Sequence, residues 1–218
     1  MSQSQISASP SSIHWPQLLE EVYRGRQTYE FKRSFDIPLS PHDIWIVCRG
    51  IVQLSTFTRE GDEAILGMVY PDIPFGLPLT CLEPYVTTAL TDVVLLRLSQ
   101  AELERSPMLA QGIMLQLNRR LQQAEELLAL THQHPMSLRC QQLLLLLAKE
   151  IGEQTPDGIR LRIRLTHQQI ANLLGSSRVS ITRLFGLLRK QGWLSIDTSH
   201  HIVIRDSAVM ELSQATVR

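Results

Sequence analysis

The chain has 218 residues, 44% of them hydrophobic, which is enough to bury one large core or two small ones. Its 21 basic and 21 acidic residues balance, but they are unevenly distributed. Residues 1–136 hold 10 basic and 15 acidic residues, whereas residues 137–218 hold 11 basic and 6 acidic residues. The positive charge of the C-terminal part favours contact with phosphates there. No apolar run approaches the roughly 18 residues of a membrane span, and no secretory signal is evident. The three cysteines lack the spacing of a disulfide framework or a metal site. We therefore expect a cytoplasmic protein without metal or cofactor.

The front half is predicted to form a tail, a short helix and a set of strands. Residues 1–12 are rich in Ser and Gln and are predicted to be disordered, and residues 15–24 predict a helix. Gly61-Asp62 predicts the tip of a hairpin. Alternating runs predict strands over residues 29–31, 44–48, 51–56, 64–69, 87–90 and 93–98. Many short strands at close spacing imply an antiparallel barrel or roll.

A long helix is predicted to start at Pro107, capped by Ser106, and to end near Gln133. One of its faces repeats apolar residues in alternate steps of four and three, which is the pattern of a coiled-coil interface. This face consists of Ala110, Met114, Leu117, Leu121, Ala124, Leu128 and Thr131. A second apolar face, of Leu109, Ile113, Leu127 and Leu130, is expected to pack on the roll. Two apolar faces favour a parallel homodimer; the alternative is one buried helix in a monomer.

The segment from His132 to Pro135 predicts a break and a hinge, and its two histidines are interpreted as linker residues rather than metal ligands. A Leu-rich helix follows over residues 136–151. Residues 159–165 predict a strand whose outer face carries Arg160, Arg162 and Arg164. Residues 193–196 and 202–204 predict a second hairpin, with His200 and His201 at or near its tip. These two histidines either approach a DNA phosphate or are exposed to solvent without a role.

Between these strands, residues 166–192 predict two short helices joined by a tight turn. Thr166 with Gln169 forms a capping-box pattern, Gly175 ends the first helix, and Ser177 caps the second. The apolar positions Ile181, Leu184 and Leu188 predict the buried face of the second helix. This is the layout of a helix-turn-helix that places its second helix in the DNA major groove.

The face left over on the second helix carries the residues predicted to read bases: Arg178, Val179, Thr182 and Arg183. Arginine is the usual bidentate partner of guanine in the major groove. The residues predicted to contact DNA phosphates lie at or near helix starts and are Thr166, Gln168, Ser177 and Ser180.

The segment LTHQQIANLLGSSRVSITRLFGLLRKQGWLSI resembles the DNA-binding domain of the CRP/FNR superfamily of bacterial transcription regulators, and its GSSRVSITRL part looks most like the cyanobacterial global nitrogen-control regulators. The resemblance covers most of the chain and is strongest over residues 136–204. It implies an α+β protein with an N-terminal double-stranded β-helix (jelly-roll) sensor domain, a long dimerisation helix and a C-terminal winged helix-turn-helix. The implied divisions are residues 1–106, 107–135 and 136–218.

The resemblance also bears on the effector. In the family, an FGE segment and a later Arg-Ser-Ala run hold a cyclic nucleotide. Here the matching residues are Phe75-Gly76-Leu77 and Glu83-Pro84-Tyr85. The glutamate of the first segment is therefore replaced by Leu77, and the arginine and serine of the second by Glu83 and Pro84. An acid facing a phosphate is electrostatically unfavourable, so cyclic AMP is not expected to be the ligand.

The nitrogen regulators bind 2-oxoglutarate with an FG turn, an arginine of the roll, and an arginine and a glutamate of the long helix. Phe75, Gly76, Arg120 and Glu125 match this set, but Tyr85 stands in place of the roll arginine. The loss of one carboxylate-binding arginine argues against that ligand. Two alternatives stay open: these residues hold an effector, or Arg120 and Glu125 are ordinary solvated helix residues and the sensor domain binds nothing.

These observations predict a dimeric, sequence-specific transcription regulator with double-stranded DNA, a second copy of the chain and RNA polymerase as partners. Val179, which can contact a thymine methyl group, matches the GTA-like half-site of the nitrogen regulators. The alternative is an effector-binding regulatory subunit whose winged domain contacts protein, and a gel-shift assay with Arg178→Ala distinguishes the two. No Ser-His-Asp, metal-ligand or paired-carboxylate arrangement favours an enzyme.

Overall fold

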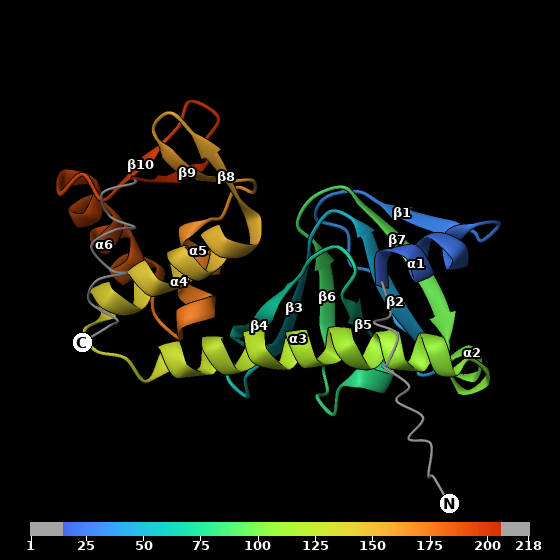
Figure 1. Cartoon of the computed structure of the whole chain (residues 1–218). Helices are drawn as coiled ribbons and strands as arrows, with labels where there is room; N and C mark the ends of the chain where they lie inside the picture. Colours follow the sequence, from blue (N-terminus) through green and yellow to red (C-terminus); the bar gives the residue numbers. More distant parts are fainter. Residues whose placement is uncertain (1–14, 206–218) are drawn as a thin grey trace, which may run out of the picture.

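The computed structural model describes residues 15–205, so the predicted disordered tail at residues 1–12 lies outside the described part. Figure 1 shows a β-roll and a winged domain placed along one long helix, α3 (Pro107–Thr131). Helix α1 (Trp15–Tyr23) lies against the roll, and α2 (Gln100–Arg105) connects the roll to α3. The predicted helix at residues 15–24 is thus confirmed, whereas the sequence patterns did not predict α2.

The β-roll consists of two antiparallel sheets, with strand orders β1-β7-β2-β5 and β4-β3-β6. Its strands are β1 (Thr28–Phe31), β2 (Asp43–Arg49), β3 (Val52–Phe57), β4 (Glu63–Val69), β5 (Pro74–Phe75), β6 (Val86–Ala89) and β7 (Val93–Ser99). All six predicted strands and the β3–β4 hairpin are present. The two-residue strand β5 and the 3₁₀ turn η1 (Leu77–Leu79) were not predicted, because segments this short carry no periodic signal.

The first half of α3 packs on the roll through its predicted second apolar face. Leu109 and Ile113 are buried with strand residues of β2 and β7 and with Trp15 of α1. Gly112 permits this approach, because a Cβ atom there would lie 2.1 Å from the Trp15 ring. The indole Nε1 of Trp15 donates a hydrogen bond of 3.2 Å to the carbonyl oxygen of Asp72. Helix α1 therefore fastens α3 to the roll.

The other apolar face of α3 is largely uncovered. Met114, Leu121 and Leu128 are 61%, 58% and 61% exposed, although each is a large hydrophobic side chain. Leu117 differs, because it is partly buried against the α1 cluster. We refer to Met114, Leu117, Leu121, Ala124 and Leu128 as the apolar seam. In the described part of the chain, no helix is both long and apolar enough to cross a membrane.

The winged domain begins after the predicted break at residues 132–135. Its helices are α4 (Met136–Ile151), α5 (His167–Leu174) and α6 (Arg178–Lys190). Its sheet has the order β10-β11-β9-β8 and contains β8 (Gly152–Thr155), β9 (Gly158–Leu161), β10 (Leu194–Ile196) and β11 (Ile202–Ile204).

The predicted strand at residues 159–165 is shorter in the structure, since β9 ends at Leu161. Its partner β8 pairs Gly152 with Leu161 and has no residue left to continue the ladder. The chain then turns, and the amide of Arg162 donates to the carbonyl of Ile151 instead, at 3.0 Å. Ile163 and Leu165 stay buried, so burial keeps alternating beyond the end of the strand.

Candidate DNA-binding interface

Two capped helices form the helix-turn-helix predicted from the sequence. The Thr166 hydroxyl oxygen accepts from the amide of Gln169, whose side chain accepts from the amide of Thr166, which completes a capping box. Gly175 ends α5 with φ 58°, a left-handed conformation that suits glycine. The hydroxyl oxygen of Ser177 then accepts from the amide of Ser180 at 3.1 Å and starts α6. Local capping therefore fixes the turn between the two helices.

Helix α6 divides sharply into a buried face and an exposed face. Ile181, Phe185 and Leu188 are buried, whereas Leu184 is only partly so. Phe185 was not among the predicted buried residues, although it lies four residues after Ile181 and so falls on the same face of the helix. The four predicted base-reading residues, Arg178, Val179, Thr182 and Arg183, are all exposed.

Within this face, Val179 is an apolar side chain that is 59% exposed. Thr182 is already engaged, because its hydroxyl donates to the carbonyl of Arg178 at 2.8 Å and lies 2.9 Å from Nδ1 of His167. Since the hydroxyl proton is used, Nδ1 of His167 acts as the donor to Thr182. Partial burial, and then the charge of Arg178, lower the pKa of His167. Arg178, Val179 and Arg183 remain as the side chains available to bases.

The predicted phosphate-contacting residues gather at the N-termini of α5 and α6. Thr166, Gln168, Ser177 and Ser180 are exposed. The first turn of α6 carries no acidic residue. Because a helix N-terminus combines free amide groups with a positive dipole end, both starts suit an anion such as a DNA phosphate.

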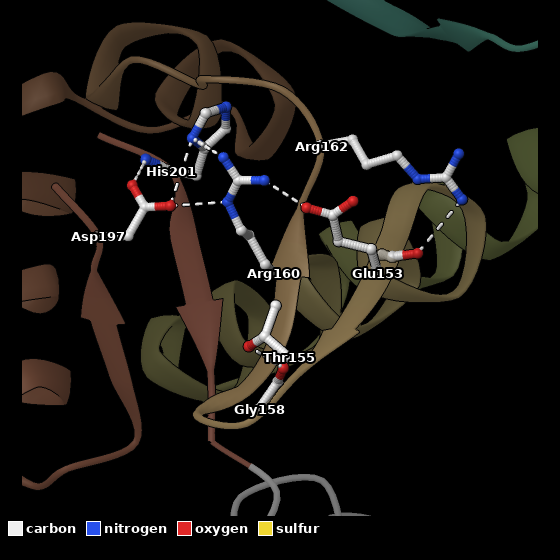
Figure 2. Close-up of polar contacts among 8 residues, drawn as sticks. Glu153, Thr155, Gly158, Arg160, Arg162, Asp197 and His201 are labelled. Carbon is white, nitrogen blue, oxygen red and sulfur yellow. Dashed lines mark hydrogen bonds and ion pairs between the residues drawn. The ribbon is translucent and has the colours of Figure 1, made fainter. Parts of the chain in front are cut away.

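Arg160 does not belong to a free basic face, contrary to the prediction. Figure 2 shows its guanidinium between side chains of β8 and the β10–β11 hairpin. Its Nη1 donates to Glu153, its Nε to Oδ2 of Asp197 at 2.7 Å, and its Nη2 to Nδ1 of His201 at 2.7 Å. His201 is consequently held by Arg160 and is only 13% exposed at its side chain, rather than being a free group at the wing tip.

This network joins β8 and β9 to the turn between β10 and β11. The other two arginines of residues 159–165 are exposed. Arg162 donates to the carbonyl of Gly152 at 3.5 Å. Arg164 precedes α5 by three residues, so its positive charge lies near the start of the helix-turn-helix.

We predict that Asp197→Asn destabilises the winged domain in a pH-dependent way. The amide of His201, and then Arg160, hold the pKa of Asp197 at about 2, below its ordinary value of 3.8. A depressed folded-state pKa gives stability that is present above pH 3.8 and is lost as the pH falls through about 2. The difference in melting temperature between the native protein and the variant should therefore be largest near neutral pH and shrink between pH 4 and 2.

Thermal unfolding followed by circular dichroism at stepped pH checks this prediction. Asp157→Asn is the matched control, because Asp157 is exposed in the β8–β9 turn. A constant difference between Asp197→Asn and the native protein over the whole acid range would contradict the role given to the carboxylate.

The predicted effector residues are only partly brought together. Arg120 of α3 donates from Nη2 to the hydroxyl of Tyr85 at 3.2 Å and from Nη1 to the carbonyl of Pro74 at 3.3 Å. Phe75 is fully buried, and Gly76 follows it at the same turn. Arg120 is thus no ordinary solvated residue, whereas Glu125 is exposed and makes none of these contacts. Burial raises the pKa of Tyr85 although Arg120 lowers it, so the hydroxyl stays protonated.

A polar contact between the roll and α5 was not predicted. The side-chain amide of Gln53, which is 4% exposed, donates to Glu63 at 2.8 Å and accepts from Gln169 at 3.4 Å. Asn172 of α5 donates to the other carboxylate oxygen of Glu63 at 3.1 Å. In the sequence, isolated Gln, Glu and Asn residues are typical of ordinary surface positions, so no local pattern predicted this contact.

Comparisons with known proteins agree with this geometry. Residues 139–212 match a Crp-like helix-turn-helix domain. The regulatory protein CysR of Synechococcus elongatus is 35% identical over 159 residues, which cover 72% of this chain and 73% of the relative. The global nitrogen regulator of Synechocystis sp. is 31% identical over 180 residues, covering 78% and 80%.

The fold likewise matches solved structures. A transcriptional regulator of the CRP/FNR family from Thermus thermophilus superposes with a TM-score of 0.71 at 25% identity, covering 86% of this chain and 98% of that one. The two sequence relatives span about three quarters of the chain, and the structure joins a β-roll to a capped helix-turn-helix. The chain therefore belongs to the CRP/FNR family of DNA-binding transcription regulators, which are not enzymes.

Proposed function

We propose that the protein binds, as a homodimer, a palindromic operator with GTA-like half-sites and regulates transcription from it without cyclic AMP. The observation that carries this proposal is the exposed face of α6. Two arginines and an apolar valine project from a helix whose opposite face is buried at Ile181, Phe185 and Leu188. Arg178 and Arg183 would each contact guanine O6 and N7, and Val179 would contact a thymine methyl group. Thr182, with its hydroxyl engaged, offers chiefly its methyl group.

The dimeric state is supported by the uncovered apolar seam of α3. Three large side chains on one helical face are more than half exposed, which is typical of a surface that a second chain covers. A symmetric dimer would place two recognition helices about 34–36 Å apart, so that they enter successive major grooves. Thr166, Gln168, Ser177 and Ser180 would fix this register through phosphates. RNA polymerase would be the further partner at a promoter.

Independence from cyclic AMP is supported by the turn after β5. Leu77 stands at the position that carries the acidic residue in the family, and Glu83 places a negative charge where the family has an arginine. Tyr85, which is 8% exposed and bonded to Arg120, fills the same part of the roll. Arg120, the positive side chain that donates to this turn, is already bonded to the hydroxyl of Tyr85 and to the carbonyl of Pro74.

Selection of binding sites from random double-stranded DNA tests the proposal. We expect the full-length protein to enrich a palindrome with GTA and TAC half-sites one helical turn apart. Addition of cyclic AMP should leave the enriched sequence and its affinity unchanged. Enrichment of single, unpaired half-sites would contradict the dimeric operator, and a lack of any enrichment at low salt would favour the alternative in which the winged domain contacts protein.

A further inference from the structure

The winged domain is held to the β-roll by a chain of hydrogen bonds as well as by the covalent link through residues 132–135. In Figure 1, α5 lies where the winged domain meets β4 of the roll. Gln53 of β3 donates from Nε2 to Oε1 of Glu63 at 2.8 Å, and Asn172 of α5 donates from Nδ2 to Oε2 of the same carboxylate at 3.1 Å. Gln169 of α5 donates from Nε2 to Oε1 of Gln53 at 3.4 Å. We refer to Gln53, Glu63, Gln169 and Asn172 as the interdomain latch.

The latch lies beside an apolar contact between the same elements. Leu54 of β3, Met68 of β4 and Leu173 of α5 belong to one cluster of buried residues that spans both domains. Apolar packing alone tolerates small shifts, because it has no direction. A shift of α5 along the roll would leave the polar groups of Gln53 and Glu63 covered without their partners, which is costly. The latch therefore selects one placement of the winged domain.

The orientation of the amides in the latch follows from a backbone group. The N–H of Thr166 can only donate, and it donates to Oε1 of Gln169 at 2.9 Å. Nε2 of Gln169 therefore faces Oε1 of Gln53, so that Nε2 of Gln53 faces Glu63. Position 63 must accept a hydrogen bond there, and a carboxylate does so with either oxygen. The cap that starts α5 and the acid of the roll thus belong to one chain of hydrogen bonds.

The latch leaves the DNA-binding face open. The predicted base-reading residues of α6 are exposed while the latch is closed, and so are Thr166 and Gln168 at the start of α5. Gln168 also donates to Oδ1 of Asn172 at 2.7 Å, so the predicted phosphate-contacting end of α5 is joined to the side that contacts the roll. The latch does not have to open before DNA can bind, and it fixes the helix that would contact the phosphates.

We propose that the interdomain latch positions the winged domain on the roll and so sets the separation of the two recognition helices in the dimer. Gln53 and Glu63 are positioning residues, because they would act on DNA only through α5. This role rests on the proposed binding of a palindromic operator by a homodimer, whereas the existence of the latch does not. Without the latch, each winged domain would be less fixed, and the second half-site would be bound at a lower effective concentration.

Hydrogen exchange of the full-length protein without DNA tests the latch across the domain boundary. Glu63→Ala in the roll should accelerate exchange in α5 about tenfold or more, because it removes hydrogen bonds to a carboxylate. Asn172→Ala in α5 should conversely accelerate exchange in β3 and β4. Glu60→Ala is the matched control, since Glu60 is exposed in the β3–β4 turn. Unchanged exchange in the opposite domain for both latch variants would overturn the latch.

Fluorescence anisotropy with two labelled DNA molecules tests the positioning role. Glu63→Ala should weaken binding to a palindrome about tenfold and leave binding to a single half-site unchanged within about a factor of two. Half a helical turn of added DNA between the half-sites should weaken binding of the native protein strongly and binding of Glu63→Ala less, because loosely held domains tolerate a wrong spacing. Glu60→Ala should behave as the native protein on all three DNA molecules.

An exchange of the two side chains within the latch separates positioning from a loss of stability. Gln53→Glu alone would place two carboxylates face to face and should weaken palindrome binding. In Gln53→Glu combined with Glu63→Gln, the carboxylate at position 53 would accept from Gln169 and from the amide at position 63, whose oxygen would accept from Asn172. The double variant should therefore return palindrome binding to within about threefold of the native value.

Three outcomes would reject the positioning role: an unchanged preference for spacing in Glu63→Ala, an equal loss of affinity for the single half-site, or no recovery in the double variant. If the native protein bound no palindrome, the proposed operator would fail, while hydrogen exchange would still decide whether the latch holds α5. The two proposals therefore fail separately.

Discussion

Arg178→Ala is expected to weaken operator binding by roughly 30-fold to more than 10⁴-fold. A bidentate arginine–guanine contact is worth about 1–3 kcal/mol, and a symmetric dimer loses two of them, or about 2–6 kcal/mol. Arg178 is exposed at the first turn of α6, so its loss should not disturb the core formed by Ile181, Phe185 and Leu188. Fluorescence anisotropy with a labelled operator at fixed salt measures the change.

The design separates base reading from charge. Arg189→Ala removes the same charge from an exposed position in the last turn of α6, far along the helix from the capped end, and should change affinity only slightly. Arg178→Lys keeps the charge but loses the planar bidentate group, so it should resemble Arg178→Ala more than the native protein. Operator affinity retained by Arg178→Ala within a factor of three would contradict the role of α6 in base reading.

The elements that the sequence could predict are those set by neighbouring residues. The capping box of Thr166 with Gln169 and the left-handed Gly175 depend on contacts within four residues, so the boundaries of α5 follow from local chemistry. The same holds for Pro107 at the start of α3 and for the hairpin at Gly61-Asp62.

The features that escaped prediction depend on residues far apart in the chain. Arg160 alternates with apolar residues as an outward-facing side chain would, and only the approach of Asp197, 37 residues later, makes it the centre of an ionic network. The contact of Gln53 with Gln169 spans 116 residues. Patterns of polarity predict which face is outward, but not which outward group meets a partner.

The second prediction with a large expected effect concerns the apolar seam: Leu121→Glu should convert the dimer into a monomer. Leu121 is 58% exposed in the isolated chain and lies at the middle of the seam. In a parallel dimer the two copies of residue 121 would face each other, so the substitution would bury two like charges without partners. At about 3–5 kcal/mol for an uncompensated buried charge, the dimer dissociation constant should rise roughly 10²- to 10³-fold or more.

Sedimentation velocity across a concentration series measures this change, and Gln122→Glu supplies the control. That variant adds the same charge one residue further along α3, on the exposed flank of the seam, and should remain dimeric. Because a monomer engages only one half-site, Leu121→Glu should also lose most of its operator affinity while keeping affinity for a single half-site at low salt. A Leu121→Glu protein that stays dimeric would show that the seam is not the dimer contact, and a pairing surface elsewhere would then have to set the spacing of the two α6 helices.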